Sequence, residues 1–153
     1  MSRAFVKNLD DTVEDLPDRP ISSHLNLVTP EGLARIEAEV ARLHQEHGAA
    51  HAANDRTALA RAARDLRYWT ARRASAQLAP APSDHSEVHF GATVTIVRDD
   101  GRRQTFRIVG EDEADPAHGT VSHVSPLARA LFGKAVGDTV EVAKSQAEIV
   151  EIA

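Results

Sequence analysis

The chain has no cysteine among its 153 residues. A disulfide framework, a catalytic thiolate and a cysteine-ligated zinc site are therefore excluded. There is also no run of about 18 apolar residues, the length that a membrane-spanning helix needs. Residues 1–7 lack the apolar stretch of a signal peptide. We therefore expect a soluble, cytoplasmic protein with no membrane partner.

Chemistry-bearing patterns are also scarce. Nothing in the sequence resembles a nucleophile paired with a base, a closed metal cage or a phosphate-binding loop, so we expect a protein that is not an enzyme. His44, His47 and His51 are spaced as one helical face that could ligate a metal. No carboxylate has a matching spacing, which favours ordinary surface histidines, and we expect no metal site and no cofactor.

The net charge of −5 is unevenly distributed. Residues 29–83 carry a net charge of +2 and residues 84–153 a net charge of −5, which suggests two surfaces with different partners. Residues 1–28 are predicted to be a mostly irregular arm with two prolines. This arm also carries an acidic cluster, formed by Asp10, Asp11, Glu14 and Asp15.

An antiparallel helical hairpin, a coiled coil, is predicted over residues 29–79. Thr29 can cap the first helix, with Pro30 at its first helical position. Apolar residues then recur every three or four positions; the first seam is Leu33, Ile36, Val40, Leu43, His47 and Ala50. Residues 47–55 are the expected turn region, into which the first helix can extend. Asn54 or Asp55 can cap a second helix, whose seam is Leu59, Ala62, Leu66, Trp69, Arg73 and Ala76.

A proline-containing linker, residues 80–87, precedes a domain of short strands, residues 88–153. The expected strands are Val88–Val97, Gln104–Val109, Thr120–Val124, Thr139–Val142 and Ala147–Ile152. Asp99-Asp100-Gly101 and Val136-Gly137-Asp138 are expected turns. Ser125-Pro126 begins a short helix, Leu127–Phe132. The predicted fold class is therefore α+β, with a helical hairpin followed by a mostly antiparallel sheet and one short helix.

Several of these motifs, in this order, resemble the bacterial Gre transcript-cleavage factors, GreA and GreB. The resemblance to their C-terminal domain is carried by Phe90–Val94, Arg107–Gly110, Asp112–Asp115, Ser125–Leu131, Gly133-Lys134 and Val136–Asp138. Residues 29–33, Thr-Pro-Glu-Gly-Leu, resemble the start of the family's coiled coil. The resemblance covers roughly residues 27–153.

This resemblance implies an FKBP-like C-terminal domain that docks on RNA polymerase at the rim of its secondary channel. The coiled coil of the family enters the channel, where acidic residues at its tip help to position a magnesium ion that belongs to the polymerase. The polymerase itself cleaves the backtracked RNA. The implied function is that of a transcription elongation factor, working as a monomer, with contact to RNA or DNA inside the transcription complex.

The hairpin tip departs from the family pattern. The family carries a Gly-Asp-x-x-Glu-Asn-like motif there. In this chain Asp55 stands at the position of the first acid, whereas Ala58 and Leu59 stand at the positions of the glutamate and the asparagine. The arms are also shorter, by roughly ten residues each, or about 15 Å of reach, as in Rnk-like members. Both differences argue against stimulation of transcript cleavage.

The interface candidates fall into two groups. Asp112, Glu113 and Asp115 form an acidic edge that suits a basic partner, and Ser125 with Pro126 begins the neighbouring helix. On the second helix of the hairpin, a basic face could contact phosphates or be an ordinary solvated surface; it consists of Arg61, Arg64 and Arg72. Two alternatives follow: a regulator that binds nucleic acid directly through this helix, or an FKBP-like prolyl isomerase.

Overall fold

The computed structural model describes residues 16–153, which form two compact units. The first unit contains residues 16–23 and 35–75, and the second contains residues 24–34 and 76–153. The predicted arm and the predicted hairpin therefore each contribute residues to both units. The acidic cluster predicted within residues 10–15 lies outside the described residues.

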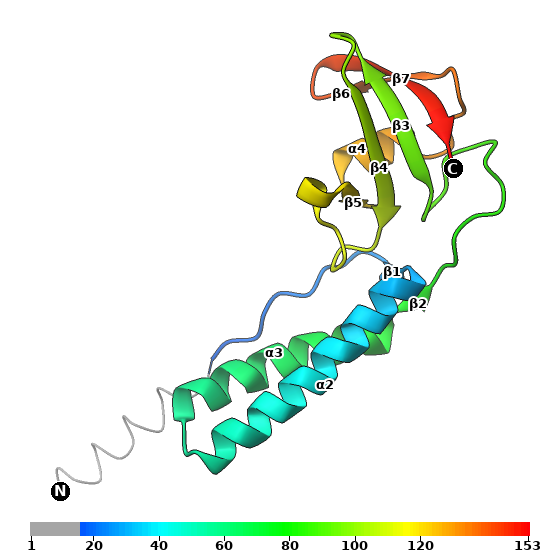
Figure 1. Ribbon diagram of the computed structural model, residues 1–153. Coiled ribbons are helices and arrows are strands. Elements are labelled where there is room, and N and C mark those ends of the chain that lie inside the picture. The colour runs from blue at the N-terminus through cyan, green and yellow to red at the C-terminus, as the bar shows by residue number, and fades with distance from the viewer. Residues whose placement is uncertain (1–15) are drawn as a thin grey trace, which may run out of the picture. The chain divides into compact units, whose positions relative to one another are not determined.

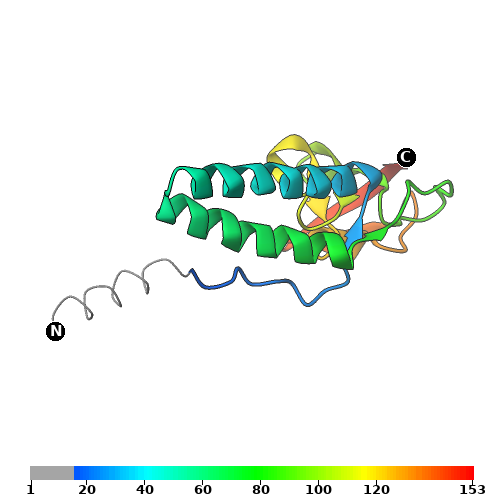
Figure 2. The same cartoon turned by 90° about the horizontal axis from the view of Figure 1, so that it is seen from below.

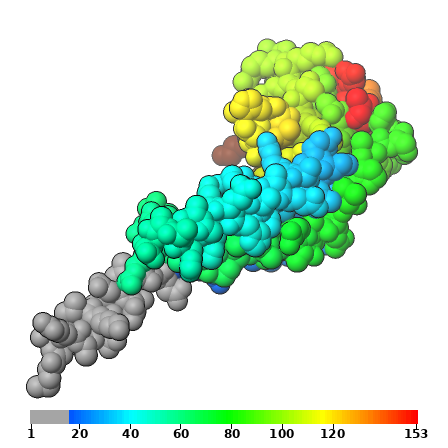
Figure 3. All heavy atoms as spheres, turned by 60° about the horizontal axis from the view of Figure 1, so that its bottom comes forward, coloured from blue at the N-terminus to red at the C-terminus, as the bar shows by residue number. Residues whose placement is uncertain are grey.

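Two helices, α2 (Pro30–Ala52) and α3 (Arg56–Ser75), form the predicted hairpin and lie side by side in Figures 1 and 3. The predicted seam of α2 is confirmed, because four of its residues are buried, Ile36, Val40, Leu43 and Ala50, and the other two, Leu33 and His47, are half-buried. On α3, Ala62 is buried, whereas Leu66 and Trp69 are half-buried. The hairpin core is therefore supplied mainly by α2.

One seam position on α3 was predicted wrongly. Arg73 is exposed, and Arg72 is buried with 1% of its surface exposed. From Trp69, steps of three and of four residues both satisfy the helical period, so spacing alone could not separate the two arginines. Arg72 therefore occupies the buried position in the last turn of α3.

Backbone capping closes the hairpin tip. Asn54 has a φ of 52°, the left-handed conformation that often ends a helix. Its N–H donates to the His51 carbonyl at 3.2 Å, and the Asp55 N–H donates to the Ala50 carbonyl at 3.0 Å, which is the Schellman pattern. Asp55 then caps α3, because its Oδ1 accepts the Ala58 N–H at 3.1 Å. The chain thus reverses between two capped helices within a few residues.

The second unit contains a five-stranded sheet in the order β5-β4-β3-β7-β6 (Figure 1). The strands are β3 (Thr93–Arg98), β4 (Arg103–Val109), β5 (Thr120–Ser122), β6 (Thr139–Val142) and β7 (Ser145–Ile152). Only the β4–β5 pair is parallel among these. The expectation of a mostly antiparallel sheet is confirmed.

The short helix α4 (Pro126–Leu131) packs on this sheet. Apolar side chains of the sheet and of α4 form one core, and its buried members are Val88, Ala92, Val94, Ile96, Ile108, Val121, Ala128, Leu131, Val140, Ala147, Ile149 and Ile152. The first strand was expected from Val88 but begins at Thr93, because Gly91 turns the chain with a φ of +86°. The expected turn over Asp99–Gly101 is confirmed, with Gly101 at a φ of +85°.

A second, two-stranded sheet was not predicted. β1 (Leu27–Val28) pairs in parallel with β2 (Gln77–Leu78), residues that flank the hairpin in the sequence. The α+β class is confirmed, whereas the FKBP-like description of the second unit stays a prediction. Within residues 16–153, no helix is both long and apolar enough to cross a membrane.

Candidate functional site

The acidic edge of the second unit begins where β4 ends. Glu113 is half-buried, and its Oε2 accepts the hydroxyl proton of Thr29 at 2.6 Å. The same Thr29 hydroxyl accepts the Gly32 N–H at 3.0 Å and so caps α2, as predicted. Glu113 therefore has a structural role at the start of α2 that sequence reasoning did not detect.

Asp115 is the more accessible acid of this edge. It precedes a short 3-10 helix, Pro116–His118, and its Oδ2 lies 2.6 Å from the His118 Nδ1. Asp112 is half-buried. Near the start of α2, Glu31 lies 3.4 Å from the Arg107 guanidinium. The pKa of Glu31 is lowered by its own backbone N–H and then by the charge of Arg107.

Ser125 and Pro126 begin α4 as predicted. The Ser125 hydroxyl accepts the Ala128 N–H at 3.2 Å, and Pro126 stands in the first turn, where it costs no hydrogen bond. Pro126 is exposed, whereas Ser125 is half-buried. Pro126 can therefore contact a partner, whereas the Ser125 side chain is already used by the helix.

Two substitutions of Ser125 test whether its hydroxyl caps α4. Ser125→Ala removes the cap of α4 and should lower the free energy of unfolding by about 1 kcal/mol, measured by urea denaturation. Ser125→Asp keeps an acceptor at this position and should stay close to the wild-type stability. Equal stability of all three proteins would show that the hydroxyl does not cap α4.

The hairpin tip places Asp55 in an exposed position. Its Oδ1 is used by the cap, and a small hollow of about 330 Å³ lies beside it, lined mainly by alanines together with Glu46. Ala58 and Leu59 lie in the first turn of α3. The tip therefore presents an acid at the first motif position and apolar side chains at the positions of the family's glutamate and asparagine.

Only part of the predicted basic face is exposed in the structure. Arg61 is exposed, and Arg64 is half-buried with its Nε 3.1 Å from the Asp65 Oδ1. Arg72 cannot belong to an exposed face because only 1% of it is exposed. The prediction was wrong for Arg72, since Arg72 lies three residues after Trp69 and takes the buried position of that turn.

The three histidines of α2 form no ligand cluster. His44 and His51 are exposed and His47 is half-buried. No group of three or more His, Cys, Asp or Glu side chains within residues 16–153 is arranged to hold a metal ion. The histidines are therefore read as surface residues of the hairpin.

Contacts between residues 16–19 and α3 were missed. Asp18 pairs with Arg67, and Arg19 pairs with Asp65 and covers the Tyr68 ring at 4.0 Å from its centroid. The only available signal was a pair of opposite charges between two prolines, which did not indicate a position on α3.

Comparisons with known proteins show what this chain is similar to. Residues 83–153 match the family model described as "Transcription elongation factor, GreA/GreB, C-term". A solved structure, the "prokaryotic transcription elongation factor GreA/GreB from Nitrosomonas europaea", is 20% identical with a TM-score of 0.42. That alignment covers 84% of this chain and 98% of the solved one.

Two curated relatives are named transcription elongation factor GreA. The protein of Methylobacterium nodulans is 59% identical over 58 residues, which cover 37% of either chain. That match therefore spans only about a third of the relative's length. The protein of Rhodospirillum rubrum is 36% identical over 137 residues, covering 75% of this chain and 86% of the relative. The chain therefore belongs to the GreA/GreB family of transcription elongation factors.

Proposed function

We propose that this protein binds RNA polymerase through its second unit and regulates elongation by placing the α2–α3 hairpin in the secondary channel. The observation that carries the proposal is the match of residues 83–153 to the C-terminal model of the GreA/GreB elongation factors. In this proposal the protein catalyses no reaction, acts as a monomer in the cytoplasm and holds no cofactor. Any magnesium ion belongs to the polymerase.

The acidic edge of the second unit suits this docking role. Exposed Asp115 and half-buried Asp112 give a negative edge for basic elements of the partner, and Pro126, exposed at the start of α4, offers an apolar contact. Glu113 and Ser125, the other two candidates, support the surface through their internal hydrogen bonds. Arg61 and Arg64 are the candidates for contact with RNA or DNA inside the complex.

The tip supports occupation of the channel more than stimulation of cleavage. α2 has 23 residues, which give a rod of about 35 Å. A magnesium ion prefers several oxygen ligands, and the tip offers Asp55, whose Oδ1 already caps α3. The proposed action is therefore to occupy the channel and compete with other factors there.

Binding to RNA polymerase tests the docking role. The purified protein should bind the polymerase at micromolar concentration or below. The double variant Asp112→Asn/Asp115→Asn should bind about five- to tenfold more weakly, because rim charges act mainly on encounter. Glu148→Gln, an exposed acid on β7 of the same unit, is the matched control and should bind as the wild type does. No binding at tens of micromolar would refute the proposal.

Transcript cleavage by halted polymerase tests the proposal that the hairpin occupies the channel without stimulating cleavage. The protein should not accelerate cleavage, whereas a cleavage factor added as a positive control should. Acceleration that disappears in Asp55→Ala would show that this short tip does position the ion. The two alternatives, direct nucleic-acid binding and prolyl isomerisation, gain no support from relatives that are named elongation factors.

A further inference from the structure

Residues 16–21 run along α3 as an extended segment, called the strap below (Figures 1 and 2). Pro17 and Pro20 bracket the charged pair Asp18-Arg19. Each proline fixes its own φ, so the free strap has fewer conformations to lose when it settles on the helix. The sequence of the strap is therefore suited to reversible binding in an extended form.

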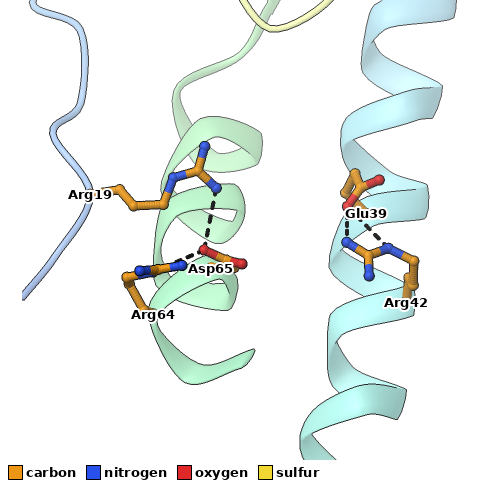
Figure 4. Close-up of polar contacts among 5 residues, drawn as sticks. All are labelled: Arg19, Glu39, Arg42, Arg64 and Asp65. Carbon is orange, nitrogen blue, oxygen red and sulfur yellow. Dashed lines mark hydrogen bonds and ion pairs between the residues drawn. The ribbon is translucent and has the colours of Figure 1, made fainter. Parts of the chain in front are cut away.

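The strap and α3 match in charge at two points. The Asp18 Oδ1 lies 2.5 Å from the Arg67 Nε, and the Arg67 Nη2 donates to the Leu16 carbonyl at 3.2 Å. The Arg19 Nη1 lies 3.4 Å from the Asp65 Oδ1, an oxygen that Arg64 also approaches, as Figure 4 shows. Opposite charges in the order Asp-Arg on the strap thus face Arg67 and Asp65, which fixes the register.

The strap covers side chains of the kinds that dominate protein interfaces. The Arg19 guanidinium lies 4.0 Å from the centroid of the Tyr68 ring and 5.9 Å from that of Trp69. Tyr68 and Trp69 are the single tyrosine and tryptophan of the chain, and their rings meet edge to face at 5.1 Å. Tyrosine, tryptophan and arginine are enriched among the residues that carry most of the binding energy of interfaces.

The strap is held by contacts that are easily broken. None of residues 16–21 is buried, and Ile21 is 52% exposed. The side chains of Asp18 and Arg67 are 74% and 47% exposed. Exposed ion pairs are individually weak and are screened by salt. A segment needed for the hairpin core would instead bury apolar side chains.

We propose that the strap is an autoinhibitory segment: it covers the side of α3 formed by Asp65, Arg67 and Tyr68, and it must leave before a partner can use that side. A partner that fits this side of α3 presents a carboxylate to Arg67 and a cation or apolar group to the Tyr68 ring. The identity of that partner as RNA polymerase rests on the proposed function, whereas the strap itself is tested on the free protein.

A spin label tests the strap in solution. Because the chain has no cysteine, Ile21→Cys can carry a single nitroxide, and the Trp69 indole N–H gives a single reporter signal. The label should broaden this signal at low salt and much less at about 1 M salt, where the Debye length is about 3 Å. Added Asp18→Arg should release the strap and clearly weaken the broadening. The exchange Asp18→Arg/Arg67→Asp should restore it. Broadening that Asp18→Arg leaves unchanged would overturn the proposal.

Binding of the unlabelled variants to RNA polymerase tests autoinhibition. Asp18→Arg should bind about three- to tenfold more tightly than the wild type, because the competent fraction no longer limits affinity. The Asp18→Arg/Arg67→Asp exchange should bind more weakly than the wild type, because it restores the strap contact and also removes the cation that faces the partner's carboxylate. Equal or weaker binding by Asp18→Arg would overturn autoinhibition. If no variant binds polymerase, the proposed function fails, while the spin-label result still decides whether the strap is a releasable cover.

Discussion

Replacing Gly110 by alanine should open the β1–β2 sheet. Gly110 is buried directly after β4, and a Cβ there would lie 2.5 Å from the Leu27 carbonyl oxygen and 3.6 Å from the Val28 Cα. The obstacle is backbone that is paired with Gln77 and Leu78, so no flexible side chain can move aside. We expect the free energy of opening the β1–β2 sheet to fall by about 2–3 kcal/mol, within the range for overpacking a tight site.

Amide hydrogen exchange measures this loss locally. The Gln77 and Ala79 N–H groups donate to the carbonyls of Asn26 and Val28, so their exchange reports opening of the small sheet. Their rates should rise about 30- to 150-fold in Gly110→Ala, at a factor of ten for each 1.4 kcal/mol.

Gly48→Ala is the matched control for Gly110→Ala. Gly48 lies within α2, and beyond the neighbouring backbone of that helix no atom lies within 4 Å of an added Cβ. Alanine there should stabilise the helix by about 0.5–1 kcal/mol and leave the two amides of the small sheet unchanged. Unchanged exchange in Gly110→Ala would show that Leu27 does not lie against Gly110 in solution.

The parts of the fold that could be predicted are those with a local signal. The seam of α2 repeats with the helical period, so Ile36 and Val40 were correctly placed in the hairpin core. Gly101 marked its turn because glycine adopts a positive φ at low cost. The turn between β6 and β7 gave no such signal, because it uses Ala143 and Lys144, both at positive φ, and β7 was therefore expected to begin too late.

The contacts that were missed join residues far apart in sequence. β1 and β2 have two residues each, too few to show the alternation of a strand, and the whole hairpin separates them in the sequence. Asp18 could have paired with any arginine of α3, and the sequence alone does not single out Arg67. For the candidate site, the resemblance predicted the docking candidates, which stay a prediction, whereas the internal roles of Glu113 and Arg72 depend on burial, which spacing does not determine.

The second large effect is expected at Thr29. Its side chain is fully buried, and its hydroxyl both accepts the Gly32 N–H and donates to Glu113. Thr29→Val keeps the shape but removes both hydrogen bonds, leaving the Gly32 N–H without its cap acceptor. The free energy of unfolding should fall by about 2–3 kcal/mol, because a lost cap and a lost bond to a charged acceptor act together. Thr29→Ser keeps the hydroxyl and should lose about 1 kcal/mol or less.

A double-mutant cycle identifies the partner of the Thr29 hydroxyl. Thr29→Val, Glu113→Ala and the combined variant are compared by urea denaturation, and the coupling energy should be about 1–2 kcal/mol, as for residues in one hydrogen-bonded group. A coupling near zero would mean that the two side chains do not share this bond in solution. If the coupling is clear, weaker polymerase binding by Glu113→Ala would reflect damage to the start of α2 rather than the loss of a docking contact. Asp112 and Asp115 would then be the acids through which docking itself is measured.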